Sequence, residues 1–324
     1  MIFSIVVPFY NSLPYFDVML KSLFSQIDDD VEVVFVNDGS TDNSMSALQK
    51  YESYHNIKII SIPNGGVSKA RNIGFNACTG DYVWFADSDD VIGTFAISKI
   101  KKKFKSLEFK PDIITANYYA FDDEVKNKGI LYKNDNYYNE YEDTNGIIDD
   151  PFDVLFNRKN NCTMIWNTIF RSEHLREHCI KFVEELVFAE GLVFKIKAIA
   201  NAKKFSFMNS YIYGYRVPDA KRGSLSMQHH SINETIFLIN ALEEWYYCFE
   251  KECHFKSGSD FMKLYLAQLI GDLLNYVDFL LKNEKNKNEY NEYNEYLSTK
   301  SNSFEHIKRN ITKRPSPKGE GLEG

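Results

Sequence analysis

The stretch TGDYVWFADSDDVI, residues 79–92, indicates both the fold class and the chemistry of the chain. Its apolar run, residues 82–86, is short and continuous, which is typical of a strand buried on both faces of a sheet. Three carboxylates follow within four residues, Asp87, Asp89 and Asp90. Because an unpaired buried charge is costly, either these acids stand in water at the strand end or a positive charge lies among them.

The segment before this stretch alternates between buried strands and amphipathic helices. Short β-branched apolar runs predict the strands, and apolar residues three and four apart predict the helices. The expected strands are 2–7, 31–36 and 57–62, and the expected helices are 14–26, 42–54 and 67–78. This alternation predicts an α/β fold with a mostly parallel sheet and helices on both faces.

The second half of the chain is less regular. We expect strands at 205–208 and around 211–216, followed by two amphipathic helices within 231–282. The end of the chain is biased toward Asn, Glu, Tyr and Lys, which predicts a flexible tail. The predicted division is a sheet domain at 1–226, a mainly helical C-terminal extension at 227–285 and a tail at 286–324.

Composition excludes several classes of protein. The formal net charge of −7 argues against a general nucleic-acid-binding role. No apolar run approaches the roughly 20 residues of a membrane-spanning helix, and the apolar N-terminus meets Pro8 without a basic region, unlike a signal peptide. The five cysteines are odd in number and form no CxxC pair, which favours reduced thiols. A cytoplasmic location is therefore expected.

The loops after the four strands carry residues that suit a nucleotide diphosphate. They are PFYN (8–11), NDGS (37–40), PNGG (63–66) and DSDD (87–90). Because ligands bind beyond the carboxyl ends of the strands in open parallel sheets, these four loops are expected to meet at one edge. Arg71 lies one turn into the helix that follows the glycine pair, where it can neutralise charge or contact a base.

Individual roles follow from residue chemistry. The Tyr10 ring suits stacking on a base, and the Asp38 carboxylate suits the N–H of a pyrimidine; the plainer alternatives are a core aromatic and a turn or helix-cap residue. Gly65 allows close backbone approach. Residues two apart in a strand share a face, so Asp87 and Asp89 are expected to point together. Such a pair, with substrate phosphates, commonly holds a hard divalent cation.

Four ordered blocks resemble the family 2 glycosyltransferases, which have the GT-A fold. They are SIVVPFYN (4–11), VNDGSTDNS (36–44), NGGVSKARNIGF (64–75) and TGDYVWFADSDDVI (79–92). Weaker similarity continues at WNTIFR (166–171), FVEELVFAEGLVFKIK (182–197) and YRVPDAKRGSLS (215–226). The resemblance implies transfer of a sugar from a nucleotide-sugar, usually a UDP-sugar, with inversion at the anomeric carbon and a Mn²⁺ or Mg²⁺ ion.

The resemblance also divides the domain into a nucleotide-sugar-binding half, 1–95, and an acceptor-binding half, 96–226, whose closing loop carries Arg216. Metal binding is expected at Asp87 and Asp89. The candidate donor-binding residues are Pro8, Tyr10, Asp38, Asn64, Gly65, Arg71, Asp87, Ser88, Arg216 and Ser224.

The catalytic base is where this sequence departs from the family. The family usually has a Glu-Asp pair at the start of a helix, with the Asp as base, and here the pair is Glu190-Gly191. Three interpretations stay open: Glu190 is the base; Glu184, Glu185 or another acid is the base; or the protein transfers poorly or not at all. A fourth, plainer reading is that Glu190 only faces the positive end of the helix dipole.

The acceptor is predicted only by class. Residues 101–165 are rich in Tyr and Asn, which suit sugar rings and hydroxyls. The resemblance implies a bacterial surface glycan such as lipopolysaccharide or capsule; a lipid-linked acceptor would bring peripheral contact with the inner face of a membrane. The alternative function is a non-catalytic nucleotide-sugar-binding or scaffold protein. A nicotinamide-dependent oxidoreductase is dismissed, because no GxGxxG follows the first strand.

Overall fold

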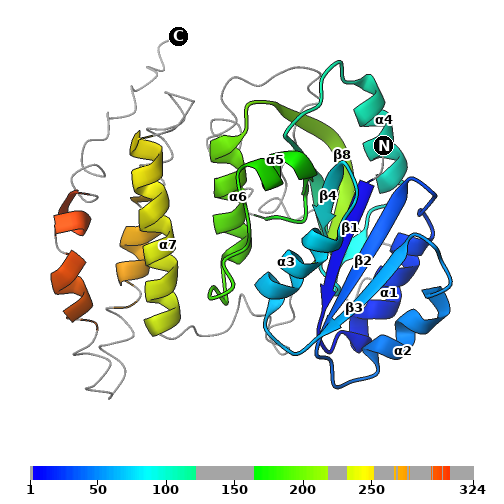
Figure 1. Ribbon diagram of the computed structural model, residues 1–324, viewed down its shortest axis with the longest axis horizontal. Coiled ribbons are helices and arrows are strands. Elements are labelled where there is room, and N and C mark those ends of the chain that lie inside the picture. The colour runs from blue at the N-terminus through cyan, green and yellow to red at the C-terminus, as the bar shows by residue number, and fades with distance from the viewer. Residues whose placement is uncertain are drawn as a thin grey trace, which may run out of the picture. The chain divides into compact units, whose positions relative to one another are not determined.

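The computed structural model describes residues 3–121, 164–217 and 232–251, together with helical residues at 266–267, 269–275, 277, 293, 295–300 and 302–306. It divides into two compact units, Met1–Gln228 and His229–Gly324. In the first unit the described strands form one eight-stranded sheet with helices on both faces (Figure 1). The predicted α/β class is therefore confirmed. The division between units falls close to the boundary expected at 226.

The N-terminal half of the sheet is parallel. Its strands are β1 (Phe3–Phe9), β2 (Val31–Asp38), β3 (Ile57–Ile62) and β4 (Tyr82–Phe85), in the spatial order β3-β2-β1-β4. All three pairings between them are parallel, so the four carboxyl ends meet at one edge as expected.

Helices α1 and α3 cover opposite faces of these strands (Figure 1). On α1 (Leu13–Phe24), Phe16 packs against Phe9 and Phe35. On α3 (Val67–Ala77), Gly74 faces Val6 and Val36, and neighbouring strand residues point to opposite faces. The helix expected at 42–54 is shorter: α2 (Ser44–Leu48) is followed by a single 3-10 turn, η1 (Gln49–Tyr51).

The second half of the sheet is mixed. Strands β5 (Val91–Ile92), β6 (Ile113–Phe121), β7 (Thr168–Arg171) and β8 (Phe205–Arg216) extend it in the order β4-β7-β6-β8-β5. Only β6 and β8 pair in parallel there. The two strands expected at 205–208 and 211–216 are one strand, because β8 continues past an irregularity in its register with β6. The helices of this half are α4 (Ala96–Ser106), α5 (Ser172–Glu177) and α6 (Glu190–Asn201).

An aromatic cluster joins α6 to the sheet. Phe194 of α6 packs edge-on against Phe85 of β4 and Phe170 of β7, at centroid distances of 5.5 and 5.4 Å. Phe182, in the segment before α6, stacks on Phe194 at 4.1 Å. Because rings of this size are major contributors to core stability, the cluster fixes α6 on the sheet.

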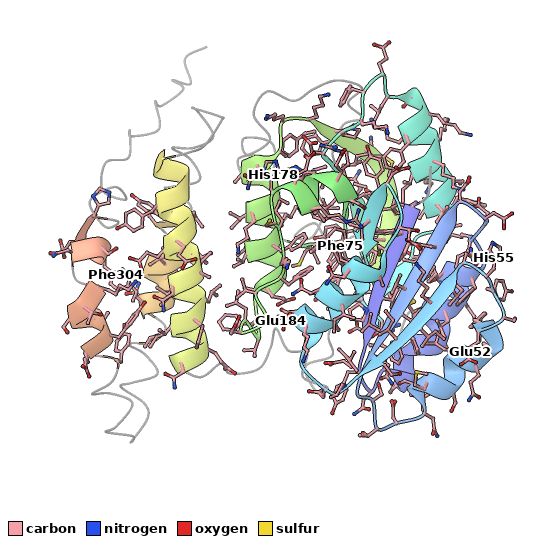
Figure 2. All side chains as sticks on the ribbon, in the orientation of Figure 1. Glu52, His55, Phe75, His178, Glu184 and Phe304 are labelled. Atoms are coloured by element: carbon pink, nitrogen blue, oxygen red, sulfur yellow. The ribbon has the colours of Figure 1, made fainter. Side chains whose placement is uncertain are left out.

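The second unit is helical in its described parts, as expected. Helix α7 (Ile232–Lys251) hydrogen-bonds to residues of the tail, from Tyr296 Oη to Asn240 Oδ1 at 2.9 Å and from Lys300 Nζ to Glu243 at 2.7 Å. Tyr293 is buried and stacks on Tyr296, which in turn packs against Phe304 (labelled in Figure 2). The tail expected to be flexible thus contains packed helical residues, because its tyrosines supply apolar contacts that a count of polar residues overlooks. No helix in the described part of the chain is long and apolar enough to span a bilayer.

Gly74 permits the close approach of α3 to the sheet, and its replacement by alanine is expected to destabilise the protein. A Cβ there would lie 2.5 Å from Val6 Cγ1 and 3.1 Å from Val36 Cγ2. Overpacking costs about 1–3 kcal/mol, whereas alanine returns up to about 1 kcal/mol of helix propensity. Urea unfolding should therefore show a net loss of stability in Gly74→Ala.

The matched control is Gly191→Ala, also in a helix. Its Cβ would lie 3.5 Å from the Ile165 side chain, an ordinary contact, so stability should be unchanged or slightly higher. Equal unfolding curves for the two variants would contradict this account of α3 packing.

Candidate active site

The acid cluster begins after β4 has ended, so a turn determines where its carboxylates point. Strand β4 ends at Phe85, and the Asp90 N–H donates to the Asp87 carbonyl at 3.4 Å. Strand alternation therefore does not place Asp87 and Asp89 on one face, as the sequence predicted. Each of the three acids instead has its own surroundings.

Asp90 is a structural acid that joins this turn to β8. It is only 2% exposed; its Oδ2 accepts from the Tyr213 hydroxyl and its Oδ1 from the Arg216 N–H, both at 2.7 Å. The same Tyr213 hydroxyl accepts the Asp87 N–H at 2.9 Å. Burial, with the charges of Asp89 and Asp87, raises the pKa of Asp90 well above its ordinary value. One of the three acids is thus explained by packing.

Asp87 is paired with a buried arginine. Arg71 is 3% exposed; its Nη2 donates to Asp87 Oδ1 at 2.6 Å and its Nη1 to Glu190 Oε1 at 2.7 Å. The guanidinium also lies 5.2 Å from the centre of the Phe182 ring. Burial works against the charge of Arg71, but the two carboxylates outweigh it and raise the pKa of the guanidinium. Arg71 therefore joins the acid turn, residues 87–90, to the start of α6. Removing any one of the three partners would leave an uncompensated buried charge.

Asp89 is the acid of the turn with an open carboxylate. The residue is exposed, and its carboxylate accepts no hydrogen bond from any other residue that the structure describes. Its main-chain oxygen accepts from Arg216 Nε at 2.5 Å. The surrounding protein atoms, and then the charge of Asp87, raise the pKa of Asp89 to about 6. Solvent on the exposed side of Asp89 screens this effect.

These acids fit a hard divalent cation that is shared with a substrate. Asp89 and the second oxygen of Asp87 are carboxylate ligands of the kind that Mn²⁺ and Mg²⁺ accept. Within the described ranges, no group of three or more His, Cys, Asp or Glu is arranged to hold a metal. A cation at this turn would therefore take its remaining oxygens from the substrate and from water, as metals bridging to diphosphates commonly do.

Asp38 holds the turn that follows β3, residues 63–66, which we call the glycine turn. Its buried carboxylate accepts the N–H of Gly65 at 2.8 Å and the N–H of Gly66 at 2.9 Å. The Asn64 side chain donates to the Asp38 carbonyl at 3.0 Å. Gly66 has a φ of +90°, in the region that favours glycine. The N–H of a pyrimidine bound here would donate to a carboxylate that already accepts the two backbone N–H groups of the turn.

The loop after β1 is hydrogen-bonded to the loop after β2, and its tyrosine is exposed. Tyr10 is 50% exposed, so the alternative of a core aromatic does not hold, whereas Pro8 is buried within β1. Asn11 Oδ1 accepts the N–H groups of Thr41 and Asp42, at 2.8 and 3.1 Å. This network fixes the backbone beside Tyr10 while leaving its ring open to a ligand.

Two further contacts connect the loops. The Ser88 hydroxyl lies 2.7 Å from the Ser12 hydroxyl and joins the acid turn to the first loop. The Arg216 guanidinium lies 4.7 Å from the ring centres of Tyr15 and Phe121. Because Arg216 Nε also donates to the Asp89 carbonyl, the guanidinium lies at the acid turn. Ser224, the other residue expected from that loop, lies outside the described residues.

Glu190 stands at the first position of α6. The residue before it, Ala189, has a φ of +56°, a left-handed conformation that non-glycine residues seldom adopt. The Glu190 side chain is 17% exposed, and its Oε1 is taken by Arg71. Gly191 is buried against Ile165 with room for an added Cβ. The alternative bases Glu184 and Glu185 are exposed in the segment before α6.

The geometry thus gathers the predicted residues of four strand ends and one helix start. From the sequence, Asp90 could not be distinguished from the other two acids, and neither Tyr213 nor Asn72 was expected at the site. A signal for Asn72 existed: Ser68, Arg71 and Asn72 are polar residues at helical spacing on a helix expected to cover the sheet.

Comparison with known proteins identifies the family. Glycosyl transferase family 2 matches residues 4–176, which is more than half of the chain. The chain therefore belongs to this family, and the resemblance found in the motifs is confirmed.

Curated relatives include bacterial glycosyltransferases. The glycosyltransferase GlyA of Streptococcus pneumoniae is 31% identical over 69% of this chain and 31% of its own length. The poly(ribitol-phosphate) beta-N-acetylglucosaminyltransferase TarS of Staphylococcus aureus is 31% identical over 66% of this chain and 35% of its own length. The cholesterol galactosyltransferase of Borreliella burgdorferi is 27% identical over 74% of this chain and 66% of its own length. The chain spans about a third of GlyA and TarS.

Solved structures confirm the expected GT-A-like fold. S. aureus TarS 1-349 in complex with UDP-GlcNAc superposes with a TM-score of 0.65 at 24% identity, over 83% of this chain and 71% of that chain. The mannosyltransferase PcManGT from Pyrobaculum calidifontis, in complex with GDP-Man and Mn²⁺, gives a TM-score of 0.51 at 12% identity, over 96% of this chain and 83% of that chain.

Proposed function

We propose that this protein transfers a sugar from a UDP-hexose or UDP-N-acetylhexosamine to a hydroxyl of a bacterial surface glycan, with inversion and with Mn²⁺ or Mg²⁺. The observation that carries the proposal is the Asp87–Arg71–Glu190 bridge. It brings a candidate metal ligand and a candidate base to the edge where Asp38 holds the glycine turn. The complex of TarS with UDP-GlcNAc supports the donor class.

On the donor side, each element has one task. The exposed Tyr10 ring stacks on the base, and Asp38 accepts its N–H while Gly65 lets the backbone approach. Asp87 and Asp89 would hold the divalent cation, whose chemistry is to neutralise the charge that develops on the leaving diphosphate. Arg216 adds a second positive charge at the same turn. We propose that Ser224, which lies outside the described residues, supplies a hydroxyl to the same diphosphate.

On the acceptor side, Glu190 is the proposed base. Arg71 holds Oε1, which leaves Oε2 to take the proton. The acceptor oxygen attacks the anomeric carbon from the face opposite the diphosphate, and a new carbon–oxygen bond forms. The old bond breaks, its electron pair leaves with UDP, and the acceptor proton passes to Glu190. A positioned carboxylate of this kind typically contributes 10²–10⁴-fold.

A second candidate function is supported by Gly191. The chain has no carboxylate where the family usually places its base, and Glu190 already serves Arg71. A non-catalytic nucleotide-sugar-binding protein would keep the donor-side residues and need no base. Release of UDP from a UDP-sugar separates this candidate from the transferase.

We propose a cytoplasmic protein that meets a lipid-linked acceptor at the inner face of the membrane and has no nucleic-acid partner. Relatives named for poly(ribitol-phosphate) and for cholesterol support an acceptor that is a polymer or a lipid.

Nucleotide binding tests the donor site directly. Because a ligand that binds only the folded state raises its apparent stability, UDP should raise the melting temperature in Mn²⁺ and do so much less in EDTA. ADP and GDP should raise it less than UDP at equal concentration. Absence of any shift with UDP and the UDP-sugars would contradict the proposed donor site.

Replacement of Asp38 by alanine should reduce the preference for UDP. A site built around a hydrogen bond discriminates strongly against ligands that lack it, and a bond to a charged group is worth roughly 1.5–3 kcal/mol. Calorimetry should therefore show UDP binding at least about tenfold more tightly than ADP in the parent, and a ratio near one in Asp38→Ala.

Asp42→Ala is the control. Its carboxylate accepts the N–H groups of Leu13 and Ser44 rather than those of the glycine turn, so the UDP preference should remain. Equal affinities of the parent for ADP and UDP would end the assignment of Asp38.

A further inference from the structure

Asn72 of α3 binds the segment that leads into α6, residues 182–190, through both ends of its side-chain amide. Its Nδ2 donates to the Phe182 carbonyl at 2.9 Å and to Glu184 Oε1 at 3.1 Å, and its Oδ1 accepts the Phe182 N–H at 2.9 Å. Figure 2 labels Glu184, which lies beside α3. The amide is buried, so loss of these bonds would leave buried polar groups unsatisfied.

Two neighbours of Asn72 bind the rest of the same segment. The Ser68 hydroxyl donates to the Leu186 carbonyl at 3.4 Å, and Arg71 donates to Glu190. Residues three and four apart in a helix share a face, so these three side chains form one polar strip along α3. The strip begins two residues after Gly66, which Asp38 holds in the donor-side turn.

Phe182 anchors the start of segment 182–190 through both its backbone and its ring. Asn72 fixes its backbone, while its ring stacks on Phe194 at 4.1 Å and packs edge-on against Phe85 at 5.1 Å. At the other end, Ala189 has the left-handed φ of +56°. Such a conformation persists only where surrounding contacts hold it. The segment therefore needs anchors on both sides, and the α3 strip supplies them.

We infer that Asn72 is a positioning residue for Glu190. It fixes segment 182–190 on α3, so that the helix which starts at the donor-side glycine turn also sets the orientation of the acceptor-side carboxylate. This inference rests on the proposed function, since it assumes that Glu190 acts on the acceptor. It assigns to Asn72 no contact with the donor, and the two sides of the site can therefore be separated experimentally.

The test compares Asn72→Ala with Asn76→Ala, which alters an exposed asparagine one turn further along α3. We expect Asn72→Ala to lower kcat for UDP release in Mn²⁺, with the UDP-sugar and acceptor that the parent uses, by roughly 10–100-fold, because small misplacements of catalytic groups cost up to about 10²-fold. The Kd of UDP should stay within about twofold of the parent value. Amide hydrogen exchange should rise in 182–190 and not across the sheet. Asn76→Ala should match the parent in all three measurements.

An unchanged kcat, or a loss of UDP affinity parallel to the loss of kcat, would overturn the inference. Faster exchange throughout α3 and β1–β4 would also overturn it, because that result marks a general packing role. If Asn72→Ala does not fold, Asn72→Asp applies the same criteria, since it keeps the acceptor for the Phe182 N–H and removes both donors. A parent that releases no UDP from any of UDP-glucose, UDP-galactose, UDP-GlcNAc and UDP-GalNAc would overturn the proposed function, while hydrogen exchange would still decide whether Asn72 holds the segment.

Discussion

Replacement of Glu190 by glutamine is expected to lower the rate of sugar transfer by roughly 10²–10⁴-fold. The glutamine amide cannot take the proton from the hydroxyl of the sugar acceptor. Its oxygen can still accept a hydrogen bond from Arg71, in place of the present 2.7 Å ion pair. The residue does not face the diphosphate in the proposed mechanism, so the Kd of UDP should change by no more than about twofold. Single-turnover assays with a matched acceptor glycan measure the transfer rate without product release.

Two companion variants sharpen this result. Glu185→Gln alters an exposed acid of the segment before α6 and should leave the rate unchanged if Glu190 is the base. Gly191→Asp introduces the carboxylate that the family usually has, at a position with room for a Cβ. A large increase in rate would show that the native site lacks a working base, whereas a decrease would show that Glu190 occupies the working position. An unchanged rate in Glu190→Gln would remove Glu190 from the mechanism.

Replacement of Asp89 by alanine is expected to abolish the effect of Mn²⁺ on nucleotide binding. Asp89 has the open carboxylate of the acid turn, while one oxygen of Asp87 already accepts from Arg71. Calorimetry should show weaker UDP binding for Asp89→Ala in Mn²⁺ and nearly equal binding of variant and parent in EDTA. Because metal stabilisation of a leaving diphosphate is worth several kcal/mol, the transfer rate should fall by roughly 10²-fold or more.

The control for this variant is Asp81→Ala. Asp81 is also exposed and lies at the other end of β4, away from the acid turn. Its replacement should leave the difference between Mn²⁺ and EDTA intact. Equal UDP affinities of Asp89→Ala and parent in Mn²⁺ would contradict the metal assignment.

The parallel half of the fold could be predicted from the sequence because its signals are local. A strand buried on both faces must be apolar throughout, and 31–36 and 82–86 show that pattern directly. The mixed half was less predictable. Strand β7 is only four residues long, and its antiparallel pairings with β4 and β6 join segments far apart in the chain. No local pattern specifies such partners.

The candidate site likewise has a part that the sequence predicts and a part that it does not. The sequence indicated which strand ends would meet, because parallel order alone brings them to one edge. It could not distinguish the roles of Asp87, Asp89 and Asp90, since these depend on Arg71 and Tyr213 from other elements. Nor could it show that Glu190 is held by Arg71 across 119 positions of the chain. Long-range polar contacts of this kind require the folded structure.

Release of UDP from UDP-sugars tests the central claim most directly. The full chain would be incubated with UDP-glucose, UDP-galactose, UDP-GlcNAc and UDP-GalNAc, with an acceptor glycan panel, in Mn²⁺ and in EDTA. The proposed function predicts that at least one UDP-sugar yields UDP and a glycosylated product in Mn²⁺, and that EDTA suppresses both. UDP binding in Mn²⁺ without any product from any donor would contradict the transferase and favour the nucleotide-sugar-binding alternative.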